Sequence, residues 1–350
     1  MKIKTLLLFL LFSGAYAQNQ VEAEKLINEG VALHDKGDYQ GAIDKYSKAL
    51  EVDKDNLLAY SEKAMSLNAT GKYDESIKVA KLAIATHSND DLSNLYVSYA
   101  NSLDHLKKTD ESLKIYDEGI EKFPNYYQLY FNKGICYANM NKRDDAILCF
   151  QKSLKINPKH AGSLNAIGTL EMGEHRIPAV LAFSRFLIVE PQTSRSKKNF
   201  KSLQSLLMQG VTQTGTKSIS ININAASLPD STGTANKKEN DFSITDLILS
   251  MDAALDFDKK NIKKTDVENF IRKFETICAS LDEVKNDNYG FYWATFVPYF
   301  LEMKKKKLIE PFAYIVYVDS GTEDVVKWHK KNQDELDKFY AWSKDYNWKK

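Results

Sequence analysis

Histidine and cysteine are the side chains of this chain best suited to nucleophilic, acid–base or metal chemistry. The cysteines, Cys136, Cys149 and Cys278, lack the short spacing of a metal site, and the six histidines are scattered singly over 350 residues. The chain has no H-E-x-x-H zinc motif, no G-x-S-x-G nucleophile turn and no glycine-rich phosphate loop. We therefore expect no catalytic residue, no metal site and no cofactor. Cys136 and Cys149 could pair across a helical hairpin, but the favoured interpretation is reduced, buried thiols.

His329, which follows Trp328, is the residue around which an alternative could be built. Active sites can assemble from residues distant in sequence, so an enzyme of unknown chemistry in the C-terminal half is the second hypothesis. Exposed tryptophan rings could instead stack on sugars. The tryptophans are Trp293, Trp328, Trp342 and Trp348. Helical spacing of the aromatic residues in this half favours core packing over sugar binding.

A pattern of small and aromatic residues repeats about every 34 residues in the first half of the chain. A small residue marks each copy, and a second landmark follows 15 or 16 positions later. The small landmarks are Gly30, Ala64, Ala100, Gly134 and Gly168, and the second landmarks are Tyr46, Ala80, Tyr116, Phe150 and Phe183. Apolar residues after Ala42 recur at spacings of three and four, which predicts an amphipathic helix. Gly37 and Gly71 suit helix ends that need a positive φ.

These landmarks resemble the tetratricopeptide repeat (TPR) family over about residues 21–194. Departures include Lys54 and Ser88 where the family has proline, residues 107–109 in place of a glycine turn, and Pro178 in a shortened last turn. The resemblance implies stacked helical hairpins whose first helices line a concave surface that holds a polypeptide. Some members grip a C-terminal carboxylate with a lysine and an asparagine, but Ile27 and Val31 occupy those positions here.

The predicted fold class is all-α, with a TPR solenoid, a flexible linker and a second, small helical domain. The predicted segments are a signal peptide at 1–17, a TPR array at 18–194, a capping helix at 195–209, a flexible linker at 210–240 and a C-terminal helical domain at 241–350. The predicted repeats, about five in number, are 23–56, 57–90, 93–126, 127–160 and 161–193. Residues 217–223 alternate polar and apolar types as a strand would.

The first residues have the pattern of a secretory signal peptide. Lys2 and Lys4 form a basic head, residues 6–12 are all apolar, and residues 15–17 read Ala-Tyr-Ala before Gln18. We therefore expect an exported chain, periplasmic or secreted, of the bacterial envelope type. The alternative is a buried N-terminal helix. The apolar run is too short to span a bilayer, and no later segment suits a membrane span.

The first-helix positions beside the small landmarks are the candidate polypeptide-binding residues. They are Ser61, Met65, Asn68, Asn94, Asn101, Gln128, Phe131, Asn139 and Asn165. Amide side chains can donate to and accept from a peptide backbone, so the expected partner is a protein or peptide. The net charge of +1 gives no reason to expect nucleic acid. The alternative interpretation is that these polar residues are simply solvated.

The C-terminal half shows helix-start signals without the repeat landmarks. Ser243 and Thr265 each stand three residues before an acidic residue and open an apolar run, Pro298 should kink or limit a helix, and a last helix should start near Asn332. The leading hypothesis is an exported, non-enzymatic scaffold whose C-terminal domain docks a second partner or folds back onto the array. An array that oligomerises through its own repeats is a third possibility.

Overall fold

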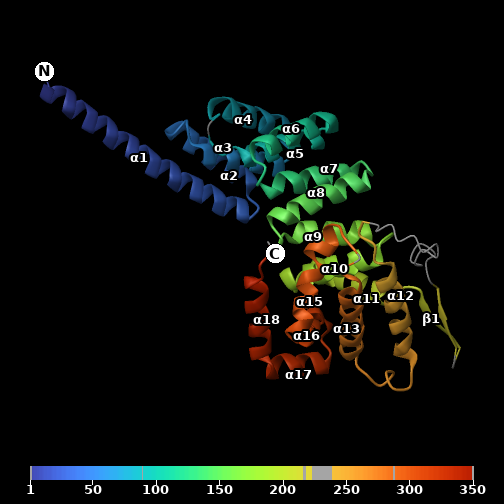
Figure 1. Cartoon of the computed structure of the whole chain (residues 1–350). Coiled ribbons are helices and arrows are strands. Elements are labelled where there is room, and N and C mark those ends of the chain that lie inside the picture. The colour runs from blue at the N-terminus through green and yellow to red at the C-terminus, as the bar shows by residue number, and fades with distance from the viewer. Residues whose placement is uncertain (1, 89, 216–217, 223–238, 287, 349–350) are drawn as a thin grey trace. The chain divides into compact units, whose positions relative to one another are not determined.

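The structure is a computed structural model that describes residues 2–88, 90–215, 218–222, 239–286 and 288–348, with side chains from residue 18 onward. It divides into two compact units, Met1–Cys149 and Phe150–Lys350 (Figure 1). The predicted all-α class is confirmed, since the only strands in the described residues are two short ones. No helix in the described ranges is long and apolar enough to cross a membrane. Most of the predicted linker at 210–240 lies outside the described residues.

The first unit is a stack of helical hairpins. Its helices are α1 (Lys2–Asp35), α2 (Tyr39–Val52), α3 (Leu57–Ala69), α4 (Tyr73–Thr86), α5 (Ser93–His105), α6 (Thr109–Lys122) and α7 (Tyr127–Asn139), and α8 (Arg143–Ile156) begins there. Gly37 and Gly71 have φ values of 83° and 76° in the first two hairpin turns. Lys107 and Asn141 adopt the same left-handed conformation, at 63° and 57°, so the later turns keep the geometry without glycine.

The small landmarks allow the two helices of a hairpin to approach closely. A Cβ atom on Gly30 would lie 2.5 Å from the ring of Tyr46, which is fully buried. In the second unit, a Cβ on Gly168 would lie 2.7 Å from the ring of Phe183. In these two hairpins the landmark pair therefore records a packing requirement, a small residue beneath an aromatic ring.

The second unit contains the last predicted hairpin and all the C-terminal helices. Its elements are α9 (Ala161–Glu171), α10 (Arg176–Val189), α11 (Ser194–Leu207), β1 (Val211–Gly215), β2 (Ser218–Ile221), α12 (Ser243–Ala254), η2 (Leu255–Phe257), α13 (Asp266–Val284), α14 (Phe291–Thr295), α15 (Val297–Lys305), α16 (Ile309–Val316), η3 (Val318–Ser320), α17 (Glu323–Lys331) and α18 (Gln333–Asp345). The strands pair antiparallel, with Thr212 opposite Ser220.

Helix α10 is the centre of the second unit. Every side chain from Arg176 to Ile188 is buried, and α9, α11, α12 and α16 all pack against it. A helix that is apolar on all sides needs cover on all sides. The C-terminal helices supply that cover, so they pack onto the last predicted hairpin.

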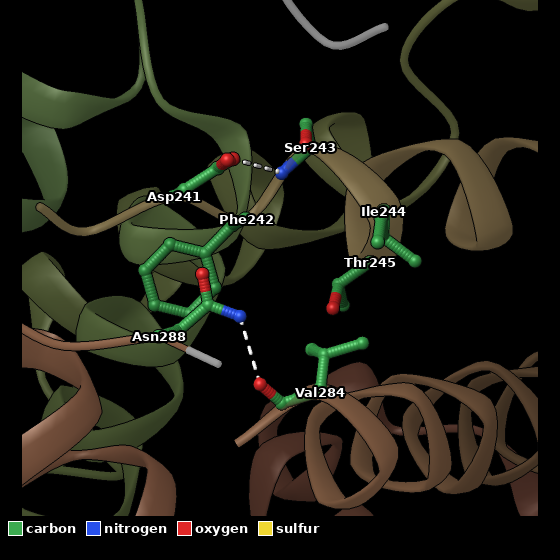
Figure 2. A pocket seen from close by; sticks show the side chains of 7 residues that line it. All are labelled: Asp241, Phe242, Ser243, Ile244, Thr245, Val284 and Asn288. Carbon is green, nitrogen blue, oxygen red and sulfur yellow. Dashed lines mark hydrogen bonds between the residues drawn. The ribbon is translucent and has the colours of Figure 1, made fainter. Parts of the chain in front are cut away.

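The helix-start signals predicted in the C-terminal half are confirmed, except that Ser243 is not the N-cap of α12. Thr265 and Glu268 form the capping box that starts α13, and Pro298 lies in the first turn of α15. The prediction that Ser243 caps α12 is wrong, because the N-cap is Phe242. The Asp241 carboxylate accepts a 2.9 Å hydrogen bond from the Ser243 backbone N–H, so one of the free N–H groups of the first turn is satisfied (Figure 2).

Candidate polypeptide-binding surface

The first helices of successive hairpins lie side by side in the first unit. Helix α1 packs on α3, α3 on α5, and α5 on α7. One side of the stack is therefore built from first helices, and equivalent positions of successive repeats are neighbours across it.

A ladder of polar contacts joins these first helices. In each contact, or rung, the residue four positions after the small landmark of one repeat hydrogen-bonds to the residue two positions after the small landmark of the next repeat. The rungs are His34 Nδ1 with Ser66 Oγ at 2.7 Å, Ser102 Oγ donating to Asn68 Oδ1 at 2.5 Å, and Cys136 Sγ donating to Asp104 Oδ1 at 3.5 Å. The ladder fixes the spacing of the helices that form the surface.

Two of the predicted binding residues form bonds between neighbouring helices. Asn68 donates from Nδ2 to the Ser98 carbonyl at 2.9 Å, in addition to its ladder bond. Asn165 Oδ1 accepts a 2.8 Å bond from Asn199 of α11. Asn165 lies in the second unit, whereas the other eight predicted residues lie in the first.

Two other predicted amides are held by tyrosine hydroxyls. Tyr126 Oη donates to Asn94 Oδ1, and Tyr116 Oη donates to Asn101 Oδ1. Burial raises the pKa of Tyr126 to about 12, so its hydroxyl keeps its proton at neutral pH. These bonds use Oδ1 alone, so the Nδ2 groups can serve as donors to a ligand.

The remaining predicted residues differ in their surroundings. Asn139 is exposed at the end of α7. The Gln128 backbone carbonyl accepts a 2.8 Å bond from Asn132, and Ser61 and Phe131 are partly buried. Met65 keeps 44% of its surface exposed.

Two exposed apolar side chains were missing from the predicted set. Leu58 is 55% exposed and Ile135 is 38% exposed. The sequence could have identified them, because Leu58 is the repeat equivalent of Asn94 and Gln128, and Ile135 is the repeat equivalent of Met65 and Asn101.

Three equivalent positions on each of three first helices form a set of residues that we call the inner grid. The inner grid is Leu58, Ser61 and Met65 of α3, Asn94, Val97 and Asn101 of α5, and Gln128, Phe131 and Ile135 of α7.

The inner grid is uncharged and mixes apolar and amide side chains. Each of its nine residues is at least partly exposed. Its apolar members lie mainly on α3 and α7, and the two asparagines lie on α5 between them. Such a surface can bury apolar side chains and hydrogen-bond a peptide backbone without a charged anchor.

The cysteines do not provide a reactive group. All three thiols are free, and burial raises the pKa of Cys136 and Cys278 to about 12 and that of Cys149 to about 11. They therefore remain protonated, and weakly nucleophilic, near neutral pH.

His329 and the tryptophans of the second unit make packing contacts. His329 Nε2 lies 2.9 Å from the Tyr314 carbonyl, and the Trp328 ring stacks on Tyr314 with centroids 4.1 Å apart. Trp293 stacks on Phe242 at 4.5 Å. Trp342 and Trp348 both pack against Tyr299, at 4.7 and 5.1 Å.

Two cavities of the second unit bear on the enzyme alternative. The smaller, of about 20 Å³, has room for a single water molecule (Figure 2). It is lined by Asp241, Phe242, Ser243, Ile244, Thr245, Val284 and Asn288. The larger, of about 120 Å³, is lined in part by Asp256 and Lys273. Asp256 forms ion pairs with both Lys273 and Arg272, which satisfies its charge. Within the described ranges, no three metal-binding side chains cluster.

Two buried arginines of α10 have opposite environments. Arg176 donates to the Leu206 carbonyl at 2.6 Å, to Asp246 at 3.0 Å and to Ser250 at 2.7 Å. Arg185 is fully buried, and none of its nitrogens has a hydrogen-bond partner. Its guanidinium carbon lies 4.0 Å from the Tyr299 ring centroid and 4.3 Å from that of Trp348. Burial lowers the pKa of both arginines.

Stacked helical hairpins whose first helices keep exposed side chains define a helical repeat fold, a class that suggests protein–protein interaction. The sequence model of the tetratricopeptide repeat matches residues 127–160, and a second, described as TPR repeat, matches residues 30–64. Both segments are therefore tetratricopeptide repeats, which confirms the prediction made from their landmarks.

Several known proteins are similar to part of this chain. A TPR repeat-containing protein of Methanocaldococcus jannaschii is 27% identical over 168 residues, which cover 45% of this chain and 30% of that protein. A probable UDP-N-acetylglucosamine–peptide N-acetylglucosaminyltransferase, SPINDLY, of Hordeum vulgare is 23% identical over 42% of this chain and 16% of its own length. A thermophilic TPR protein of Thermus thermophilus covers 52% of this chain and 99% of its own, with 16% identity and a TM-score of 0.47. The chain thus spans less than a third of the curated relatives it matches.

Replacing Asn68 with alanine should destabilise the first unit. The Asn68→Ala variant loses two bonds to α5 and leaves the Ser102 hydroxyl with one partner fewer, at a cost of about 1–3 kcal/mol in the free energy of unfolding. Urea denaturation measures the change. The exposed Asn139→Ala change on α7 is the control and should stay within about 0.5 kcal/mol. Equal losses in both variants would contradict the ladder as a structural element.

Replacing each of the two buried arginines with methionine should have different effects on the free energy of unfolding. Arg176→Met should cost about 3–5 kcal/mol, because it removes the buried guanidinium that donates to Asp246 and to the backbone carbonyls of Leu206 and Leu207. Arg185→Met removes a buried charge that has no hydrogen bonds, so the unfolding free energy should stay equal or rise. Thermal unfolding of the full chain compares the two. A comparable loss in both variants would show that ring stacking outweighs the cost of burying the Arg185 charge.

Proposed function

We propose that this protein is an interaction scaffold whose inner grid binds a segment of another polypeptide. The single observation that carries the proposal is the exposure of Leu58, Met65 and Ile135 on helices that lie side by side. Repeat helices usually bury their large apolar side chains against neighbours, so exposed ones on a shared surface indicate a site for a partner.

The composition of the grid defines the kind of segment it fits. Two apolar regions, on α3 and on α7, would accept apolar side chains of the ligand, and Asn94 and Asn101 between them would hydrogen-bond its backbone. No member of the grid is charged, so the ligand needs no charged anchor. Burial of the apolar side chains would supply most of the affinity.

We also propose that the chain is exported, to the periplasm or to the outside of the cell. The support is the basic head at Lys2 and Lys4, the apolar run after it and the small residues before Gln18. Sequencing the amino terminus of the chain purified from its envelope or medium tests this directly. We expect Gln18 as the first residue, and retention of Met1 and Lys2 would contradict export through a cleaved leader.

We propose no catalytic activity for the second unit. Support comes from the packing role of His329 and from the satisfied charge of Asp256. Deleting residues 241–350 would not show which unit binds the polypeptide. Because α10 relies on α12 and α16 for cover, such a truncation would expose its apolar side chains.

Glutamate substitutions in the full-length chain test the binding surface. A peptide selected by display on the unaltered protein should bind the Met65→Glu/Ile135→Glu variant at least about tenfold more weakly, since central apolar contacts carry most of the binding free energy. The matched control is Leu82→Glu/Leu148→Glu, which alters two side chains, 52% and 58% exposed, on second helices. Isothermal titration calorimetry measures each affinity.

The control variant should bind as the unaltered protein does. Equal weakening by both variants would mean that binding depends on net charge rather than on the inner grid. Unchanged binding by the Met65→Glu/Ile135→Glu variant would place the partner on another surface.

A further inference from the structure

Helix α12 has a second apolar face on which three of four side chains are exposed in the part of the chain that the structure describes. Its inner face, with Leu249 and Ala253, is buried against the rest of the unit. Apolar residues recur on the opposite face at spacings of four, three and four. This outer stripe is Ile244, Ile248, Met251 and Leu255. Ile244, Met251 and Leu255 are 41%, 59% and 44% exposed.

The loop after α12 extends this stripe with an exposed isoleucine among lysines. Ile262 is 66% exposed, and Lys259, Lys260, Lys263 and Lys264 are all exposed. The loop has a defined conformation, because Asn261 Nδ2 donates to the Leu255 carbonyl at 3.0 Å and the Ile262 N–H donates to the Asp258 carbonyl at 2.9 Å. These bonds hold Ile262 close to the end of the outer stripe.

Acidic residues lie on both sides of the loop, and one of them is ion-paired. Asp256 is paired with Arg272 and Lys273. Asp266 lines the larger cavity, and Glu268 accepts the Thr265 N–H in the capping box. Asp258 accepts the backbone N–H of Lys260 at 3.1 Å. Asp258, Asp266 and Glu268 are exposed beside the loop, but residues 259–264 themselves carry four lysines and no acidic side chain.

We propose that the outer stripe of α12 and the loop 259–264 together bind the surface of an anionic lipid bilayer. Ile262, Met251 and Leu255 would enter the boundary between headgroups and acyl chains, and the four lysines would contact lipid phosphates. Helix α12 has 12 residues, too few to span a bilayer, so the contact is peripheral. A protein partner fits less well, because lysine is depleted at protein–protein interfaces.

Vesicle co-sedimentation of the full-length chain tests the proposal. The protein should bind vesicles of phosphatidylcholine mixed with phosphatidylglycerol, and should not bind vesicles of phosphatidylcholine alone. The Lys259→Gln/Lys260→Gln/Lys263→Gln/Lys264→Gln variant should lose at least about tenfold in partition coefficient, because each lysine near an anionic leaflet adds about fivefold. Its control removes four other exposed lysines: Lys305→Gln/Lys306→Gln/Lys330→Gln/Lys331→Gln.

A second pair of variants tests the apolar part of the surface. Met251→Ser/Ile262→Ser should also weaken binding at least about tenfold, since two apolar side chains no longer enter the boundary region. The control, Leu82→Ser/Leu148→Ser, changes exposed leucines of the first unit and should bind as the unaltered chain does. Circular dichroism confirms that each variant is folded.

Three results would overturn the proposal. The first is no binding to the anionic vesicles, and the second is equal loss of binding in the lysine variant and its lysine control. The third is a reversible dimer, seen by sedimentation equilibrium, that Met251→Ser/Ile262→Ser abolishes without any vesicle binding. That last result would assign the outer stripe to a second copy of the chain.

Discussion

The burial of α10 on all sides is the constraint on which the second unit depends. Its apolar side chains can be covered only if helices approach from several directions, and α9, α11, α12 and α16 do so. The end of a repeat array ordinarily needs a polar cap. Here the apolar end of the last hairpin is covered by the C-terminal helices, which makes hairpin and helices one compact unit. The candidate binding surface therefore lies on the first unit, where the first helices keep exposed side chains.

Two buried arginines of α10 contact the helices that cover it. Arg176 bridges the C-terminal end of α11 and the start of α12, so it fixes the position of both relative to α10. Arg185 instead lies between the rings of Tyr299 and Trp348, which connects α10 to the last residues that the structure describes. The first arrangement satisfies a buried charge with hydrogen bonds, and the second relies on ring faces alone.

Sequence patterns predicted the features that depend on local spacing. The spacing of Gly30 and Tyr46 could be read from the sequence because the Tyr46 ring must fit over a small residue. Thr265 and Glu268 could be read as a helix cap because they form it within one helical turn. The position of the Ser243 cap was wrong because Ser243 is already the first helical residue, whose backbone N–H donates to Asp241 two residues earlier. The cover on α10 had a sequence signal, the nearly continuous apolar run from Ile177 to Val189, which is typical of a helix buried on all sides.

The roles of individual surface residues could not be read from the sequence in the same way. Asn68 looks like an exposed amide, but its partners Ser98 and Ser102 lie on the next repeat, about thirty residues away. Exposure of Leu58 and Ile135 depends on which side of the stack remains open, which the stacking of α3, α5 and α7 determines. Val211–Gly215 forms a strand only because Ser218–Ile221 pairs with it.

Site-specific photo-cross-linking tests the central claim most directly. A photoreactive phenylalanine analogue would replace Met65 or Ile135 in the full chain, with Leu82 as the position on a second helix for comparison. If the first-helix side of the first unit receives a polypeptide, positions 65 and 135 will form adducts with it and position 82 will not. Adducts from position 82 alone, or no adducts from 65 and 135 while the polypeptide still co-purifies, would contradict this assignment.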